Sequence, residues 1–73
     1  MDTGVVRTYD GRKGLGAIKP DDGGKDIMVD IKALDRAGLG GLVTGQAILF
    51  DIETDHFGRA HAVNLVIAKQ GQA

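Results

Sequence analysis

The sequence predicts an all-β fold, a single five-stranded antiparallel barrel. Apolar and polar residues alternate with a period of two in short runs, and residues typical of turns follow each run. Twelve of the 73 residues are glycine, about twice the typical share, which suits many tight turns. Five short strands are too few for two packed sheets, whereas closing one sheet on itself leaves no exposed edge.

Five runs carry the strand pattern. They are residues 4–9, 15–19, 26–31, 46–54 and 59–68. The side-chain period of strands predicts which residues face the interior. These are Val6, then Ile27, Val29 and Ile31, and then Ile48, Phe50 and Ile52. The opposite parity predicts that Met28 and Asp30 face outward.

The segment between the third and fourth strands breaks the alternating pattern. Residues 33–37 predict one helical turn that Gly38 ends, and the glycines of 38–45 predict a flexible loop. We expect residues 1–68 to form the domain and 69–73 a flexible C-terminal tail.

Charge and composition argue against several protein classes. Nine basic and ten acidic residues leave a net charge of −1, so any nucleic-acid binding must depend on local arrangement. The chain has no cysteine, and His56 and His61 alone do not complete a ligand set, so we expect no metal and no other cofactor. No signal peptide, membrane span, phosphate loop or catalytic triad is recognisable. We therefore expect a cytoplasmic protein that is not an enzyme and does not bind membranes.

The order of these elements resembles the bacterial cold-shock protein family, whose fold is an OB-fold barrel. The resemblance spans nearly the whole chain, and its strongest blocks are Lys13-Gly14-Leu15-Gly16-Ala17-Ile18, Pro20-Asp21-Asp22-Gly23-Gly24-Lys25-Asp26-Ile27, Ala33-Leu34, Arg36-Ala37-Gly38-Leu39, Gly45-Gln46 and Asn64-Leu65. It implies single-stranded RNA and DNA binding, in which aromatic side chains of the second and third strands stack on bases and lysines flank them.

This sequence keeps the frame of the family motifs but lacks their rings. Leu15 and Ala17 stand where the family has two phenylalanines. Met28 replaces a third phenylalanine, and Asp30 replaces a histidine. Leucine and methionine still cover a base by dispersion, but the Asp30 carboxylate is expected to repel phosphate.

The resemblance implies a candidate nucleic-acid interface of twelve positions. They are Arg7, Thr8, Tyr9, Lys13, Leu15, Ala17, Lys19, Met28, Asp30, Ile31, Leu39 and Arg59. Thr8 takes the place of the family's tryptophan, which leaves Tyr9 as the aromatic residue beside it. Phe57 falls in the last turn, where the family usually has a polar residue. We expect weak binding without sequence specificity, in a nucleic-acid chaperone or transcription-accessory role.

The aliphatic replacements leave a second hypothesis open. Leu15, Ala17, Met28 and Leu39 would form an apolar patch that contacts a protein partner or a second copy of the chain. Leu49 and Val66 would add outward-facing apolar residues on the last two strands, and residues 38–45 could act as a hinge for strand exchange. Nucleic-acid binding is favoured, because part of the basic frame persists.

Overall fold

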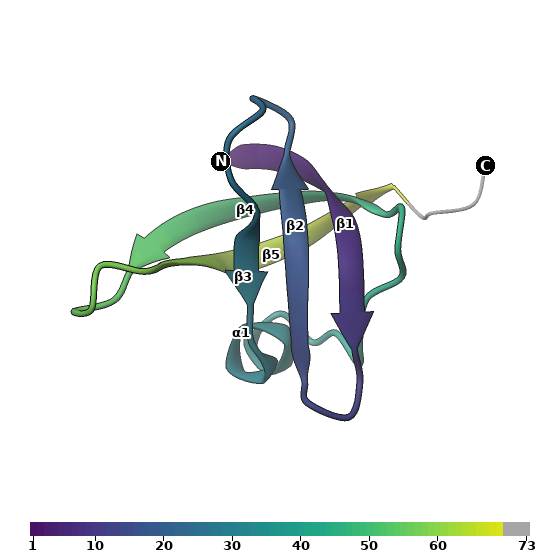
Figure 1. Ribbon diagram of the computed structural model, residues 1–73. Coiled ribbons are helices and arrows are strands. Elements are labelled where there is room, and N and C mark those ends of the chain that lie inside the picture. The colour runs from purple at the N-terminus through teal and green to yellow at the C-terminus, as the bar shows by residue number, and fades with distance from the viewer. Residues whose placement is uncertain (70–73) are drawn as a thin grey trace.

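The structure, a computed structural model, describes residues 1–69 as a closed barrel of five strands with one short helix (Figure 1). The elements are β1 (Asp2–Asp10), β2 (Leu15–Pro20), β3 (Ile27–Val29), α1 (Ile31–Arg36), β4 (Ala47–Thr54) and β5 (Ala60–Lys69). The strands are hydrogen-bonded in the order β1-β2-β3-β5-β4, and β4 pairs with β1 to close the ring. The five-stranded barrel is thus confirmed. Of the predicted tail, residues 70–73 lie outside the described residues.

One strand pair departs from the predicted antiparallel arrangement. β3 and β5 run parallel, with Met28 opposite His61, whereas the other four pairs are antiparallel. The reason is geometric: in a closed ring with an odd number of strands, neighbours cannot alternate in direction all the way round. At least one pair must be parallel.

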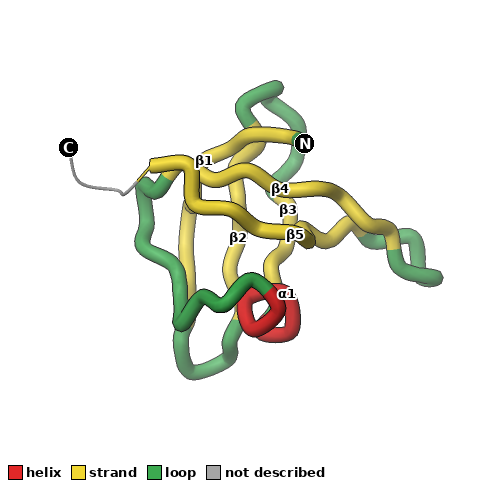
Figure 2. The backbone as a smooth tube through the Cα atoms, turned by 180° about the vertical axis from the view of Figure 1, so that it is seen from behind, coloured by secondary structure: helices red, strands yellow, loops and turns green. Residues whose placement is uncertain are grey.

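The third strand ends earlier than the predicted 26–31, at Ile27–Val29, because Asp30 caps the helix that follows. Its Oδ1 accepts a hydrogen bond of 3.0 Å from the backbone N–H of Ala33. Ile31 is therefore the first residue of α1 and is exposed, so its predicted inward-facing place is wrong. α1 lies at one end of the barrel (Figure 2).

The helix ends in a Schellman motif that turns the chain toward β4. Gly38 has a φ of +73° and its N–H donates to the Asp35 carbonyl, while the Leu39 N–H donates to the Leu34 carbonyl at 2.9 Å. This confirms Gly38 as the end of the helix. It also packs Leu39 against the core.

The barrel interior is filled by the inward-facing apolar residues of the strands and by α1. The largest fully buried side chains are Phe50, Ile18, Leu34, Ile48, Val6 and Val29. Ile52, predicted to continue the inward row of β4, is instead 47% exposed because the β4–β5 hairpin extends past β3 and out of the barrel (Figure 1). Within residues 1–69, the one helix is too short to cross a membrane.

Candidate nucleic-acid interface

The outer face of β1, β2 and β3 carries the aliphatic residues at the positions where the resemblance implies rings. In the sheet register, Ala17 lies opposite Thr8 on one side and Met28 on the other, so the three form one row across the strands. Leu15 lies on the same side of β2, opposite Asp10. Leu15 and Met28 are 38% and 45% exposed. We call Leu15, Ala17 and Met28 the aliphatic face.

Ile31 extends this surface at the start of α1. Its side chain is 54% exposed and lies against Gly14, where an added Cβ would come within 2.9 Å of the Ile31 Cβ. Gly14 also has a φ of +65°, which favours glycine. The turn before Leu15 and the helix start are therefore packed together at the edge of the aliphatic face.

Three of the four basic residues among the twelve predicted positions belong to β1, β2 and the turn between them. Arg7 is half exposed and pairs with Asp26, its Nε lying 2.7 Å from the carboxylate. Lys13 and Lys19 are exposed, and within residues 1–69 neither takes part in an ion pair. Because both lysines are exposed and unpaired there, they present their charge to solvent before and after the β2 part of the aliphatic face.

A β-bulge removes Tyr9 from the outer face. The β1–β2 register shifts between Val6 and Thr8, and Arg7 is the extra residue. Thr8 therefore faces outward, but Tyr9 turns inward and packs against the core. An added Cβ at Gly41 would lie 3.1 Å from the Tyr9 ring. Tyr9 therefore lies, partly buried, on the opposite side of the strand from Thr8, and its contact with nucleic acid stays a prediction.

Asp30 has a structural role that the sequence did not predict. Its side chain is half buried and caps α1, as described above. The capped N-terminus favours a negative charge there. Helix capping therefore gives a sufficient physical reason for an aspartate at this position, whatever its effect on phosphate.

Residues 2–68 match the "Cold-shock" DNA-binding domain family. This chain belongs to the cold-shock domain family. Cold shock protein CspA of Rhizobium meliloti is 42% identical over 66 residues, which cover 89% of this chain and 96% of the relative. Cold shock-like protein CspA of Rickettsia bellii is 45% identical over 64 residues, or 88% of this chain and 90% of the relative. Cold shock domain-containing protein 4 of Arabidopsis thaliana is 36% identical over 62 residues, covering 85% of this chain and 31% of that longer protein.

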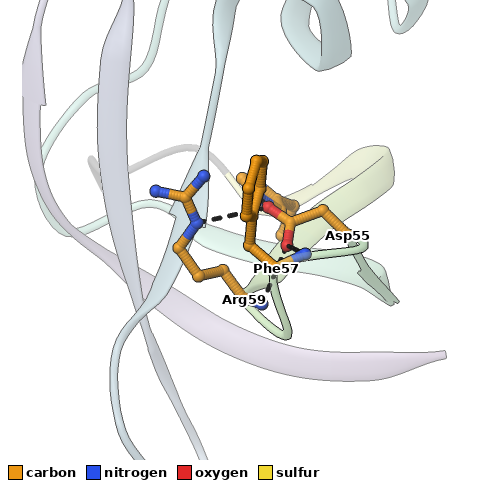
Figure 3. Close-up of polar contacts among 4 residues, drawn as sticks. Asp55, Phe57 and Arg59 are labelled. Carbon is orange, nitrogen blue, oxygen red and sulfur yellow. Dashed lines mark hydrogen bonds and ion pairs between the residues drawn. The ribbon is translucent and has the colours of Figure 1, made fainter.

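The β4–β5 turn of this cold-shock domain is organised by the Asp55 carboxylate. Oδ1 accepts hydrogen bonds of 2.9 Å from the backbone N–H groups of Phe57 and Arg59. Oδ2 lies 2.8 Å from Nε2 of His61 and 3.4 Å from Nε of Arg59 (Figure 3). The backbone hydrogen bond from Arg59 is the main cause that lowers the pKa of Asp55 from 3.8 to about 2, and the His61 contact is the second.

This turn carries the most exposed of the chain's phenylalanine and tyrosine residues. Phe57 is 71% exposed. The Arg59 guanidinium carbon lies 5.1 Å from the centre of its ring, and the His56 ring centre lies 4.3 Å away. We call His56, Phe57 and Arg59 the turn cluster. Of these, only Arg59 was among the twelve predicted positions. The signal that could have found Phe57 is an aromatic residue in a polar turn, out of phase with either flanking strand.

The two histidines have separate surroundings. His56 contacts Phe57, whereas His61 pairs with Asp55 and has a buried Nδ1 with no hydrogen-bond partner among residues 1–69. In this part of the chain, no three His, Asp or Glu side chains are grouped so that they could hold a metal ion.

Proposed function

We propose that this cold-shock domain binds single-stranded RNA or DNA weakly and without sequence preference, as a cytoplasmic nucleic-acid chaperone or transcription accessory rather than as an enzyme. The single observation that carries the proposal is the outward row formed by Thr8, Ala17 and Met28, with Leu15 beside it. This row occupies the strands on which the family resemblance implies base contacts.

The chemistry of the row accounts for the weakness. Stacking on an aromatic side chain contributes ~1–3 kcal/mol per base. Losing the rings at positions 8, 15, 17 and 28 at only ~1 kcal/mol each would raise the dissociation constant by roughly three orders of magnitude. Leu15 and Met28 recover part of this by dispersion, because their exposed side chains can lie flat against a base. We expect dissociation constants in the high micromolar range.

The charges favour a shallow dependence on salt. Lys13 and Lys19 are the exposed cations nearest in sequence to Leu15 and Ala17, and Arg7 is already paired with Asp26. Each phosphate contact to a single strand contributes ~0.7 to the slope of log K against log salt. A slope of only about one or two is therefore expected for a short oligonucleotide.

An NMR titration with a short oligothymidine tests the proposal. We expect amide shift changes concentrated at residues 15–19 and 28–31, with saturation below millimolar concentration. Val43 is 61% exposed in the loop between α1 and β4, and its amide serves as an internal control that should not move. The proposal would be overturned by a flat titration together with a shift from the monomer mass to the dimer mass as the protein concentration is raised.

The exposed apolar surface favours one second candidate, a contact with protein. Leu15, Met28 and Ile31 are 38%, 45% and 54% exposed. Clustered exposure of this kind is typical of interaction surfaces. Sedimentation over a range of concentrations distinguishes the candidates, since a homodimer through this surface would dissociate on dilution and on substitution Met28→Glu.

A further inference from the structure

We infer that the turn cluster is a base-stacking subsite, in which Phe57 stacks on one base of a single strand and Arg59 contacts that base or its phosphate. This inference rests on the proposed nucleic-acid binding and adds a second contact region to it. Phe57 lies outside the aliphatic face and outside the twelve positions expected from the family resemblance.

The first support is elimination. The chain has two phenylalanines, one tyrosine and no tryptophan. Phe50 is fully buried, and Tyr9 is partly buried and packs against the core. Phe57 is the most exposed of the three, with 71% of the residue exposed.

The second support is the fixed geometry of the turn. The Asp55 N–H donates to the Arg59 carbonyl and the Gly58 N–H to the Asp55 carbonyl, both at 2.9 Å. Together with the side-chain contacts of Asp55, these bonds hold the turn from both strands. Gly58 has a φ of +83°, which completes the tight turn. A ring held on such a frame loses little conformational freedom when a ligand binds, so less binding free energy is lost to ordering.

The third support is the chemistry around the ring. Guanidinium groups and imidazole rings are themselves planar surfaces on which bases stack. Arg59 lies over the Phe57 ring and the His56 ring is tilted against it, so a base that stacks at this turn would contact Phe57 together with these groups or displace one of them. The Arg59 side chain is 71% exposed and contacts Asp55 through Nε, so its two terminal nitrogens would be the donors to a phosphate. Such a set suits a nucleobase with its phosphate better than an aliphatic protein surface.

The fourth support is continuity with the aliphatic face. Met28 lies opposite His61 across the β3–β5 pair, so the row of Thr8, Ala17 and Met28 leads onto β5. Arg59 lies two residues before His61, roughly 7 Å along an extended chain. The hairpin that carries the turn extends past β3 (Figure 1). A single strand crossing the aliphatic face can therefore continue onto the turn cluster.

The test compares Phe57→Leu with Phe57→Tyr and uses two probes, oligothymidine and an abasic oligomer of equal length. Leucine removes the ring and tyrosine keeps it. We expect Phe57→Leu to weaken oligothymidine binding by about fivefold or more, Phe57→Tyr to preserve it, and abasic binding to be the same in all three proteins. In the unsubstituted chain, the amides of residues 56–60 should shift with oligothymidine but not with the abasic oligomer.

The possible results separate the two proposals. If oligothymidine shifts residues 15–19 and 28–31 while Phe57→Leu binds as tightly as the unsubstituted chain, the stacking subsite is overturned and the proposed function stands. If Phe57→Leu weakens both probes equally, the turn acts through charge or shape and the stacking inference is likewise wrong. If the unsubstituted chain binds neither probe, both proposals fail.

Discussion

The aliphatic face and the turn cluster, the two regions that we propose contact a single strand, differ in their chemistry. The aliphatic face lies on the wall of the barrel and has three side chains without rings or charge: Leu15, Ala17 and Met28. The turn cluster lies on a hairpin outside the barrel and combines a phenylalanine ring with a cation. The difference teaches that outward positions of a strand can carry aliphatic side chains in place of aromatic ones while inward positions still close the barrel, because the two sets alternate along the chain.

The largest expected effect is the difference in stability loss between alanine substitutions at the two phenylalanines. Phe50→Ala should destabilise the domain by about 3–5 kcal/mol, because Phe50 is fully buried. Phe57→Ala should change the free energy of unfolding by less than about 0.5 kcal/mol, as is usual for an exposed side chain. Urea denaturation followed by circular dichroism measures both. Comparable losses of stability in the two variants would show that Phe57 supports the fold, and Phe57 would then not be a purely surface residue.

The next largest effect is a gain in single-strand affinity when rings are added to the aliphatic face. The triple substitution Leu15→Phe, Ala17→Phe, Met28→Phe should raise single-strand affinity by about tenfold or more, since each ring adds stacking. Fluorescence anisotropy with a labelled oligothymidine measures the gain. As a matched control, Val66→Phe on exposed β5 should gain nothing. A folded triple variant with unchanged affinity would show that the row is not a nucleic-acid face.

A smaller effect tests the role of Asp30. Asp30→Ala should cost about 1 kcal/mol of stability, because the hydrogen bond to the Ala33 N–H is lost. Asp30→Asn keeps a capping oxygen without the charge and should be nearly neutral. The midpoints of thermal unfolding compare the two variants. If asparagine were as costly as alanine, the charge rather than the cap would be the stabilising property. A gain in affinity for Asp30→Asn alone would measure phosphate repulsion.

The smallest effect is a local response of the turn cluster to acid. The pKa of Asp55 is lowered in the folded chain from 3.8 to about 2. Its contribution to stability is therefore complete above pH 3.8 and is lost as pH falls toward 2. Amide shifts of Phe57 and Arg59 should follow this titration, whereas those of Ala17 and Met28 should not. Asp55→Asn should abolish the response. A midpoint near the ordinary value would mean that the turn is not held as described.

Alternation of apolar residues predicted the five strands and the outward position of Met28. It also predicted the buried positions of Val6, Ile27, Val29, Ile48 and Phe50, but not the exposure of Ile31 and Ile52. Three features lay beyond that signal. The bulge at Arg7 inverts the parity of Tyr9, yet nothing in the sequence marks an extra residue in β1. Asp30 fits a strand end and a helix cap equally well by local pattern. It acts as the cap because the chain that follows is helical, which brings the Ala33 N–H to its carboxylate. The network around Asp55 joins side-chain and backbone groups that no periodicity connects.

The place of β5 in the ring has a consequence for chains that lack it. β5 is the strand that joins β3 to β4, so the first four strands alone form an open sheet. Such a sheet has two bare backbone edges, at Ile27–Val29 and at Ala47–Thr54. A chain truncated before β5 would therefore be prone to pair with its neighbours through these edges.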